Sequence, residues 1–133
     1  MDIIEILFGF EGRIIRLPYI GYSIVSMLAM FAMFIASAPM LAASSSAFSL
    51  AIGFFTLTAG AGIGAWTTMA LTAKRLHDLD WSGKHVISVY AVHLSASFAH
   101  TGSVLAVVCT TASIMIALWL AFWPGTDGPN HFG

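Results

Sequence analysis

The chain has 133 residues, of which 59% are apolar and only 8% are charged, and its formal net charge is −1. Soluble domains carry about 25% charged residues, so this composition excludes an ordinary water-soluble domain and indicates a protein embedded in lipid. A net charge near zero also argues against a nucleic-acid partner.

The first helical hairpin is predicted from a long run without charge. Residues 1–16 contain acidic residues and no basic n-region, so we expect them to be retained as a cytoplasmic or interfacial segment. From Leu17 to Ala73 there is no charged residue, and one helix of that length would measure about 85 Å. A bilayer's hydrocarbon core is about 30 Å thick, so the run must turn back, most simply in the small polar stretch 42–47. The predicted transmembrane helices are residues 19–41 and 48–72.

A second hairpin is predicted after the charged stretch 74–84, which we expect to be a cytoplasmic loop. The next charge-free run divides at the turn formers 100–103. This division predicts helices at residues 84–99 and 104–123 and a cytoplasmic tail at 124–133. Helices are expected because backbone amides in lipid must be satisfied within each segment.

The basic residues set the predicted orientation. All five lie on the side of the two termini, so the positive-inside rule places both termini in the cytoplasm. The predicted fold is therefore all-α: one polytopic membrane domain of residues 1–133, with four transmembrane helices in two hairpins packed as a four-helix bundle.

Three ordered motifs carry a resemblance to a known family. They are FEGRIIRLPY at 10–19, KRLHD at 74–78 followed by Ser82-Gly83, and PGTDGPNHFG at 124–133. This set resembles the bacterial inner-membrane family catalogued as domain of unknown function 805, and the resemblance spans nearly the whole chain. It implies a multi-pass protein of the bacterial inner (cytoplasmic) membrane and no agreed activity. Ile20, Lys84-His85 and Phe132 depart from the family's pattern of aromatic residues.

The predicted topology brings these motifs to one cytoplasmic face. One interpretation is a structural network in which Asp78 and Asp80 receive an N-terminal arginine and Asn130 caps backbone groups. Arg75 and Asp78 are three residues apart and can also pair locally. The candidate cluster consists of Arg13, Arg16, Lys74, Arg75, His77, Asp78 and Asn130.

The same cluster also suits an anion. In this alternative Arg13, Arg16 and Arg75 contact the phosphate of a lipid head group, and Asp78 orients one of them. A metal site is a third interpretation, because His77, Asp78, Asp80 and His85 offer nitrogen and oxygen ligands. Their spacing fits no established ligand pattern, so neither a metal nor a cofactor is expected.

The tail carries turn signals. Pro124-Gly125 fits the centre of a type II turn, and Asp127-Gly128 suggests a second turn. We expect a shaped tail in which Asn130 and His131 fold back under the helices. The alternative is a disordered terminus.

Two patterns lie inside the predicted spans. Gly53, Gly60 and Gly64 give one side of the second helix a nearly bare surface, which suits close packing within the chain or a dimer contact. A polar stripe on the third helix is expected to face the protein interior. Its histidine at 93 either relays protons or forms ordinary hydrogen bonds. The stripe consists of Tyr90, His93, Ser97 and His100.

Two functions follow from these patterns. The first is a non-enzymatic membrane module whose cytoplasmic face binds anionic lipid head groups or a partner protein. The alternative is a small oligomeric transporter or channel that uses the polar stripe, although no charged residue lies inside a predicted span. No catalytic residues are predicted. The expected partners are membrane lipid and a second copy or another membrane protein.

Overall fold

A computed structural model describes residues 2–42 and 46–132. All regular elements in this part of the chain are helical, which confirms the predicted all-α class. The elements are α1 (Ile3–Phe8), α2 (Arg16–Ala42), α3 (Ala47–Asp78), the 3-10 turn η1 (Gly83–His85), α4 (Val86–Phe98) and α5 (Val104–Phe122). The predicted turn at 42–47 falls partly on residues 43–45, which lie outside the described residues.

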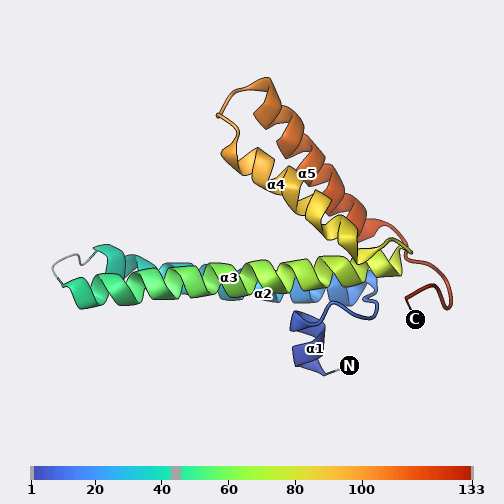
Figure 1. Ribbon diagram of the computed structural model, residues 1–133, viewed down its shortest axis with the longest axis horizontal. Helices are drawn as coiled ribbons and strands as arrows, with labels where there is room; N and C mark the ends of the chain where they lie inside the picture. Colours follow the sequence, from blue (N-terminus) through green and yellow to red (C-terminus); the bar gives the residue numbers. More distant parts are fainter. Residues whose placement is uncertain (1, 43–45, 133) are drawn as a thin grey trace.

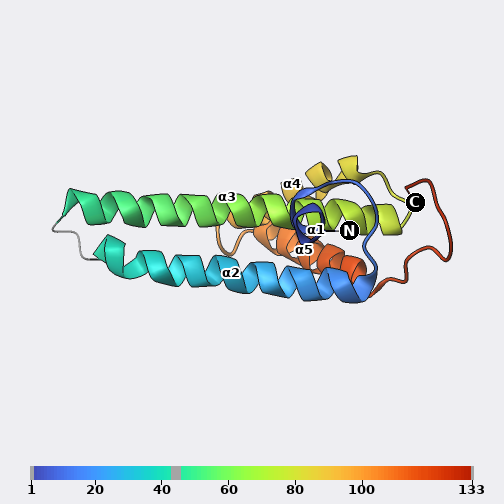
Figure 2. The same cartoon turned by 90° about the horizontal axis from the view of Figure 1, so that it is seen from below.

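The two longest helices, α2 and α3, form an antiparallel hairpin (Figures 1 and 2). Gly60 and Gly64 of α3 are buried against α2. A Cβ atom added to Gly60 would lie 2.9 Å from Met33 Cβ, and one added to Gly64 would lie 3.2 Å from Met30 Cγ. The first distance is shorter than real Cβ contacts and the second is shorter than most of them, so these glycines let the two helices approach closely within the chain.

The helix α3 extends further than its hydropathy predicts. It has 32 residues, or about 48 Å of helix, and it continues through the charged residues 74–78 that were expected in the loop. The last turn ends at the C-cap Leu79. The helix continues because the charged side chains of this turn lie inside the protein, where backbone carbonyls accept their hydrogen bonds.

The second hairpin, α4 and α5, meets the first near the end of α3 and diverges from it (Figure 1). The hairpins pack together at one end only, so the four-helix bundle expected from the sequence is not shown in the described residues. Three helices of the described chain are long and apolar enough to cross a membrane, namely α2, α3 and α5. The third predicted span, residues 84–99, is shorter than expected, because α4 has 13 residues, about 20 Å.

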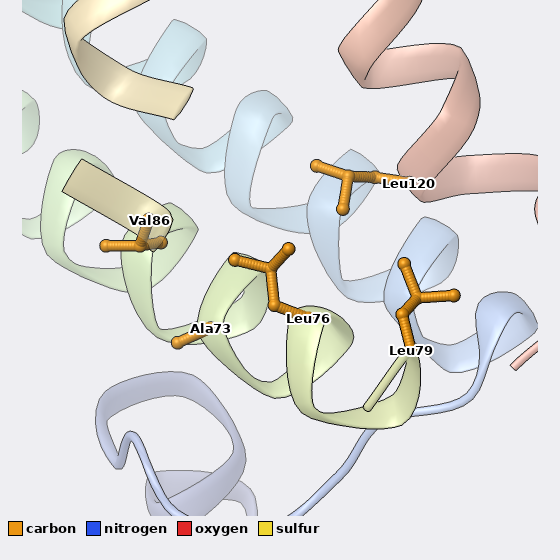
Figure 3. Close-up of a cluster of buried hydrophobic side chains, with 5 residues drawn as sticks. All are labelled: Ala73, Leu76, Leu79, Val86 and Leu120. Atoms are coloured by element: carbon orange, nitrogen blue, oxygen red, sulfur yellow. The ribbon is translucent and has the colours of Figure 1, made fainter. Parts of the chain in front are cut away.

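A small apolar core lies where the hairpins meet (Figure 3). Leu76 and Leu79 from α3 and its cap pack there with Val86 of α4 and Leu120 of α5. Each of these side chains is at most 8% exposed, while many apolar side chains elsewhere remain open to the surroundings. Burial is thus concentrated at the end of α3, which makes this junction the place where the hairpins are joined.

The short helix α1 packs on α3, on the side away from the second hairpin (Figures 1 and 2). Trp66 Nε1 donates a hydrogen bond to the Phe8 carbonyl at 3.1 Å. The same indole ring contacts Phe10 edge-on, with ring centroids 5.3 Å apart. The N-terminal segment is therefore anchored to the first hairpin near the junction.

Candidate functional site

Lys74 and Arg75 are the two largest side chains that are fully buried, with 0% exposed surface each. Successive residues on an α-helix project about 100° apart, so the two side chains leave α3 on different sides. Lys74 reaches α1, and Arg75 reaches the end of α5. The two neighbours thereby connect α3 with two separate elements.

Lys74 caps the short helix α1. Its Nζ donates hydrogen bonds to the carbonyls of Glu5 and of Ile6, the latter at 2.9 Å. The last carbonyls of a helix have no partner within the helix, and a cation near them is favourable. The Lys74 carbonyl in turn accepts a hydrogen bond from the Ile14 amide at 3.3 Å. Lys74 therefore holds the whole N-terminal segment on α3.

Arg75 caps the C-terminal end of α5, as Lys74 caps α1. Its Nε donates to the Leu120 carbonyl at 2.7 Å, and one Nη donates to the Trp123 carbonyl. The other Nη pairs with Asp78, as their spacing of three indicated. Each nitrogen of the guanidinium thus has a partner within the protein, and the side chain has no exposed surface to offer the lipid phosphate of the alternative interpretation.

The C-terminal tail docks on the end of α3. The Thr126 amide and hydroxyl both donate to the Asp78 carbonyl, at 2.9 and 3.0 Å. Asn130 Nδ2 donates to the His77 carbonyl at 2.8 Å, which is the capping role predicted for it. Gly125 fits directly against Asp78, because an added Cβ would lie 2.6 Å from the Asp78 Cγ atom. The tail is therefore shaped and not disordered in the described residues.

His77 links the N-terminal segment to the tail. Its Nδ1 lies 3.0 Å from the Gly12 carbonyl, and its ring stacks on Phe132 with centroids 4.2 Å apart. Arg13 continues this link, because one Nη donates to the Gly128 carbonyl at 2.9 Å. The three sequence motifs therefore meet at one end of the molecule.

Asp80 makes a different pair from the one predicted. Its carboxylate contacts His131 Nδ1 at 3.0 Å instead of an N-terminal arginine. The hydrogen bond from His131 lowers the pKa of Asp80 below its ordinary value. Asp80 also adopts a positive φ of 61°, which allows the chain to turn sharply after α3. The predicted pairing of Asp78 and Asp80 with Arg13 or Arg16 is thus not the arrangement found.

The candidate metal ligands have separate partners. His77 lies beside the Gly12 carbonyl, Asp78 pairs with Arg75, and Asp80 contacts His131. Within residues 2–42 and 46–132, no group of three His, Cys, Asp or Glu side chains could hold a metal ion.

The polar stripe of α4 is only partly turned inward. Tyr90 donates to Thr68 of α3, whereas His93 and Ser97 are exposed and bond to carbonyls of their own helix at 2.9 and 3.0 Å. His100 lies exposed beyond the end of α4. The divergence of the hairpins explains this pattern, because only the first turns of α4 reach α3.

A crevice beside α1 contains a basic side chain, Arg13, that is still partly accessible. Its volume is about 280 Å³. Arg13 and Lys74 both line it; Arg13 is only partly buried, whereas Lys74 has no exposed surface. The ion pairs in the described chain are Arg75 with Asp78 and His131 with Asp80, so neither Arg13 nor Lys74 has a carboxylate partner there. The crevice is lined by Ile6, Arg13, Ile14, Ile15, Pro18, Tyr22 and Lys74.

Sequence reasoning singled out the two basic residues of this crevice and missed its apolar wall. Ile15 and Tyr22 were not predicted as site residues, although both lie within two turns of an arginine. Arg16 is exposed at the start of α2, close to the crevice in sequence, but it does not line it. The useful signal was the mixture of exposed apolar residues and arginines between residues 13 and 22.

Comparison with known proteins gives one match. A family model described as "Protein of unknown function (DUF805)" matches residues 7–133. No curated protein and no solved structure matches the chain. The matched range contains all three motifs, from the Arg13 segment to the docked tail.

Proposed function

We propose, from the premise that this chain belongs to the DUF805 family, that it is a non-enzymatic membrane module that binds an anionic lipid head group. The family assigns no activity, so the proposal is argued from the geometry. Its apolar helices suit a membrane, and the resemblance points to the bacterial inner membrane.

The topology within this proposal has four crossings and cytoplasmic termini. The short third crossing consists of η1 and α4 together, residues 83–98, or about 24 Å of helix. A segment of this length crosses a bilayer of about 30 Å with local thinning of the membrane. The five basic residues then lie on the cytoplasmic side, as the positive-inside rule requires.

The observation that carries the proposal is the crevice beside α1, where Arg13 lies among apolar side chains without a carboxylate partner in the described chain. A guanidinium has five N–H donors, and the tail engages a single Nη of Arg13. The remaining donors suit a phosphate, which guanidinium groups bind in a bidentate manner. Lys74, a fully buried residue of the crevice lining, adds a second positive charge.

The surroundings of the crevice suit the acyl chains of the same lipid. Ile15 is 60% exposed and lines the crevice, and Ile3 and Ile4 of α1 are 57% and 65% exposed. A short helix with such an exposed apolar face lies in the membrane interface. The site therefore combines a cation with an apolar surface, as a phospholipid at the cytoplasmic interface requires.

Native mass spectrometry tests the proposal on the full chain released from nanodiscs that contain phosphatidylglycerol and phosphatidylcholine. We expect the wild type to retain phosphatidylglycerol preferentially. Arg13→Gln should reduce this retention about tenfold, because a hydrogen bond to a charged group is worth about 1.5–3 kcal/mol. Lys84→Gln is the matched control, since Lys84 is exposed, carries the same charge and does not line the crevice.

Two results would contradict the proposal. One is equal retention of the two lipids by the wild type. The other is an equal loss of phosphatidylglycerol in Arg13→Gln and Lys84→Gln, which would indicate a general effect of charge and no specific site. A far-UV circular dichroism spectrum and thermal transition that match the wild type show that each variant is folded.

A further inference from the structure

A second pocket with polar residues in its lining lies between the two hairpins. Its volume is about 250 Å³. Residues from α2, α3, α4 and α5 all line it. The polar residues of the lining are Tyr19, Ser23, Thr68, Thr72, Tyr90 and His93.

Such a group of polar residues is unusual in this chain, whose helices are otherwise strongly apolar. Polar side chains in a membrane are costly unless they are hydrogen-bonded, and they mark places where polar ligands bind. Val89, Ala117 and Leu120 complete the wall. The pocket is therefore a mainly apolar recess that carries six polar side chains, with lining residues from both hairpins.

The direction of the hydrogen bonds limits what the cavity can accept. Tyr90 donates to the Thr68 hydroxyl, which itself donates to the Gly64 carbonyl at 2.8 Å. His93 Nδ1 lies 2.9 Å from the Val89 carbonyl. Because a carbonyl only accepts, Nδ1 donates in this contact, and in the tautomer with its only proton on Nδ1 the Nε2 atom is an acceptor. This tautomer suits a ligand that donates a hydrogen bond to His93.

An anionic head group is disfavoured in this cavity. The nearest basic side chain is Arg75, which is fully buried and already bonded to Asp78 and to two carbonyls of the α5 terminus. It has no accessible surface to offer a phosphate. The second cavity thus differs in chemistry from the crevice beside Arg13.

We propose that this cavity binds the uncharged head group of a hydroxyl-bearing lipid of the diacylglycerol class. The free hydroxyl of the lipid donates to His93 Nε2. Its ester carbonyls accept hydrogen bonds from hydroxyl groups on the α2 and α3 side, where Tyr19, Ser23 and Thr72 line the wall. The acyl chains extend from the pocket into the surrounding lipid.

Photo-labelling tests this proposal in phosphatidylcholine vesicles that contain the full chain. The probe is a diacylglycerol with a diazirine in one acyl chain, and its matched control has the free hydroxyl methylated. We expect saturable labelling of α4 and α5 by the first probe and at least tenfold less by the second. Equal labelling by the two probes would overturn the proposal, and this comparison needs no variant.

Variants and competitors locate the site. Ala117→Phe fills the cavity and should abolish labelling, and His93→Phe should reduce it about tenfold, whereas Arg13→Gln should leave it unchanged. Unlabelled dioctanoylglycerol should displace the probe, and decylubiquinone, which has carbonyls but no hydroxyl, should not. Undiminished labelling of Ala117→Phe, or displacement by the quinone, would refute the assignment of a hydroxyl-bearing ligand to this cavity.

Discussion

Replacement of Arg75 by methionine should uncouple the two hairpins. Methionine keeps an apolar stem and removes every donor of the guanidinium. The Leu120 and Trp123 carbonyls then lose their partner, and the carboxylate of Asp78 loses its counter-charge while it is only 1% exposed. Each change acts at the junction where α3 contacts α5.

The expected loss of stability follows from the burial of the pair. Removing one partner of a buried ion pair costs about 3–5 kcal/mol, because the remaining charge is left uncompensated. Each orphaned carbonyl would add about 1–3 kcal/mol if it stayed dry. Trp123 is 58% exposed, so water relieves part of that cost. We therefore expect Arg75→Met to lower the free energy of unfolding by about 3–5 kcal/mol.

Unfolding of the full chain in mixed micelles by increasing sodium dodecyl sulfate measures this loss. Tryptophan fluorescence is a suitable signal, because Trp119 packs against the core of the junction and contacts Trp81 at 5.7 Å between ring centroids. Circular dichroism shows whether the helices themselves remain. Lys84→Met is the control for loss of one exposed positive charge and should change stability by less than about 0.5 kcal/mol.

A double-mutant cycle separates the uncompensated charge from a loss of packing. Asp78→Asn removes the carboxylate charge, so Arg75→Met with Asp78→Asn should be less destabilised than the sum of the single variants. An additive result would refute the argument, because it would mean that the buried carboxylate does not depend on Arg75. A loss below about 1 kcal/mol for Arg75→Met alone would refute it as well.

Two further predictions concern the tail. Gly125→Ala should displace the tail from α3, because the added Cβ would lie 2.6 Å from Asp78 Cγ. Hydrogen exchange of the Thr126 amide should become at least tenfold faster in this variant than in the control Asp127→Ala. Equal exchange rates in the two variants would contradict the close fit of Gly125. The second prediction concerns pH. The hydrogen bond from His131 lowers the pKa of Asp80 from its ordinary value of 3.8. This contact therefore stabilises the docked tail above pH 3.8, and the stabilisation is lost as the pH falls through the lowered pKa of Asp80. Carbon-13 NMR of the Asp80 carboxyl should show a titration midpoint below 3.8 that rises in His131→Ala, and an unchanged midpoint would exclude the contact.

The hairpins could be predicted from the sequence because their signals are local. A charge-free run longer than a bilayer must turn, and small polar residues mark where it turns. The same local signal misplaced the end of α3, because hydropathy assigns Lys74 and Arg75 to water. Their acceptors lie far away in the chain: Glu5 is 69 residues from Lys74, and Leu120 is 45 residues from Arg75. No window of neighbouring residues contains that information.

The predicted topology places the three motifs on one face, but it does not predict most of the contacts that join them. Topology alone brings the three motifs to one end, and the structure joins them through His77, Asn130 and Arg13. Composition could not tell which basic groups would remain available. The availability of a basic group depends on which backbone carbonyls it bonds. Lys74 bonds carbonyls at the end of the short helix α1, and this helix was not predicted from the sequence.

Because Arg75 is buried at the junction and Arg13 lines the crevice, variants of these two residues test the stability of the fold and the binding of lipid separately. Arg75 is fully buried and paired with Asp78 at the junction, so its replacement should reduce lipid binding only to the extent that it unfolds the protein. Arg13 bonds the tail through one Nη and lines the crevice, so its loss should reduce lipid binding while the helices remain folded. A chain in which Arg75→Met kept its fold yet lost phosphatidylglycerol, while Arg13→Gln retained it, would place the anion site at the junction and exclude the crevice.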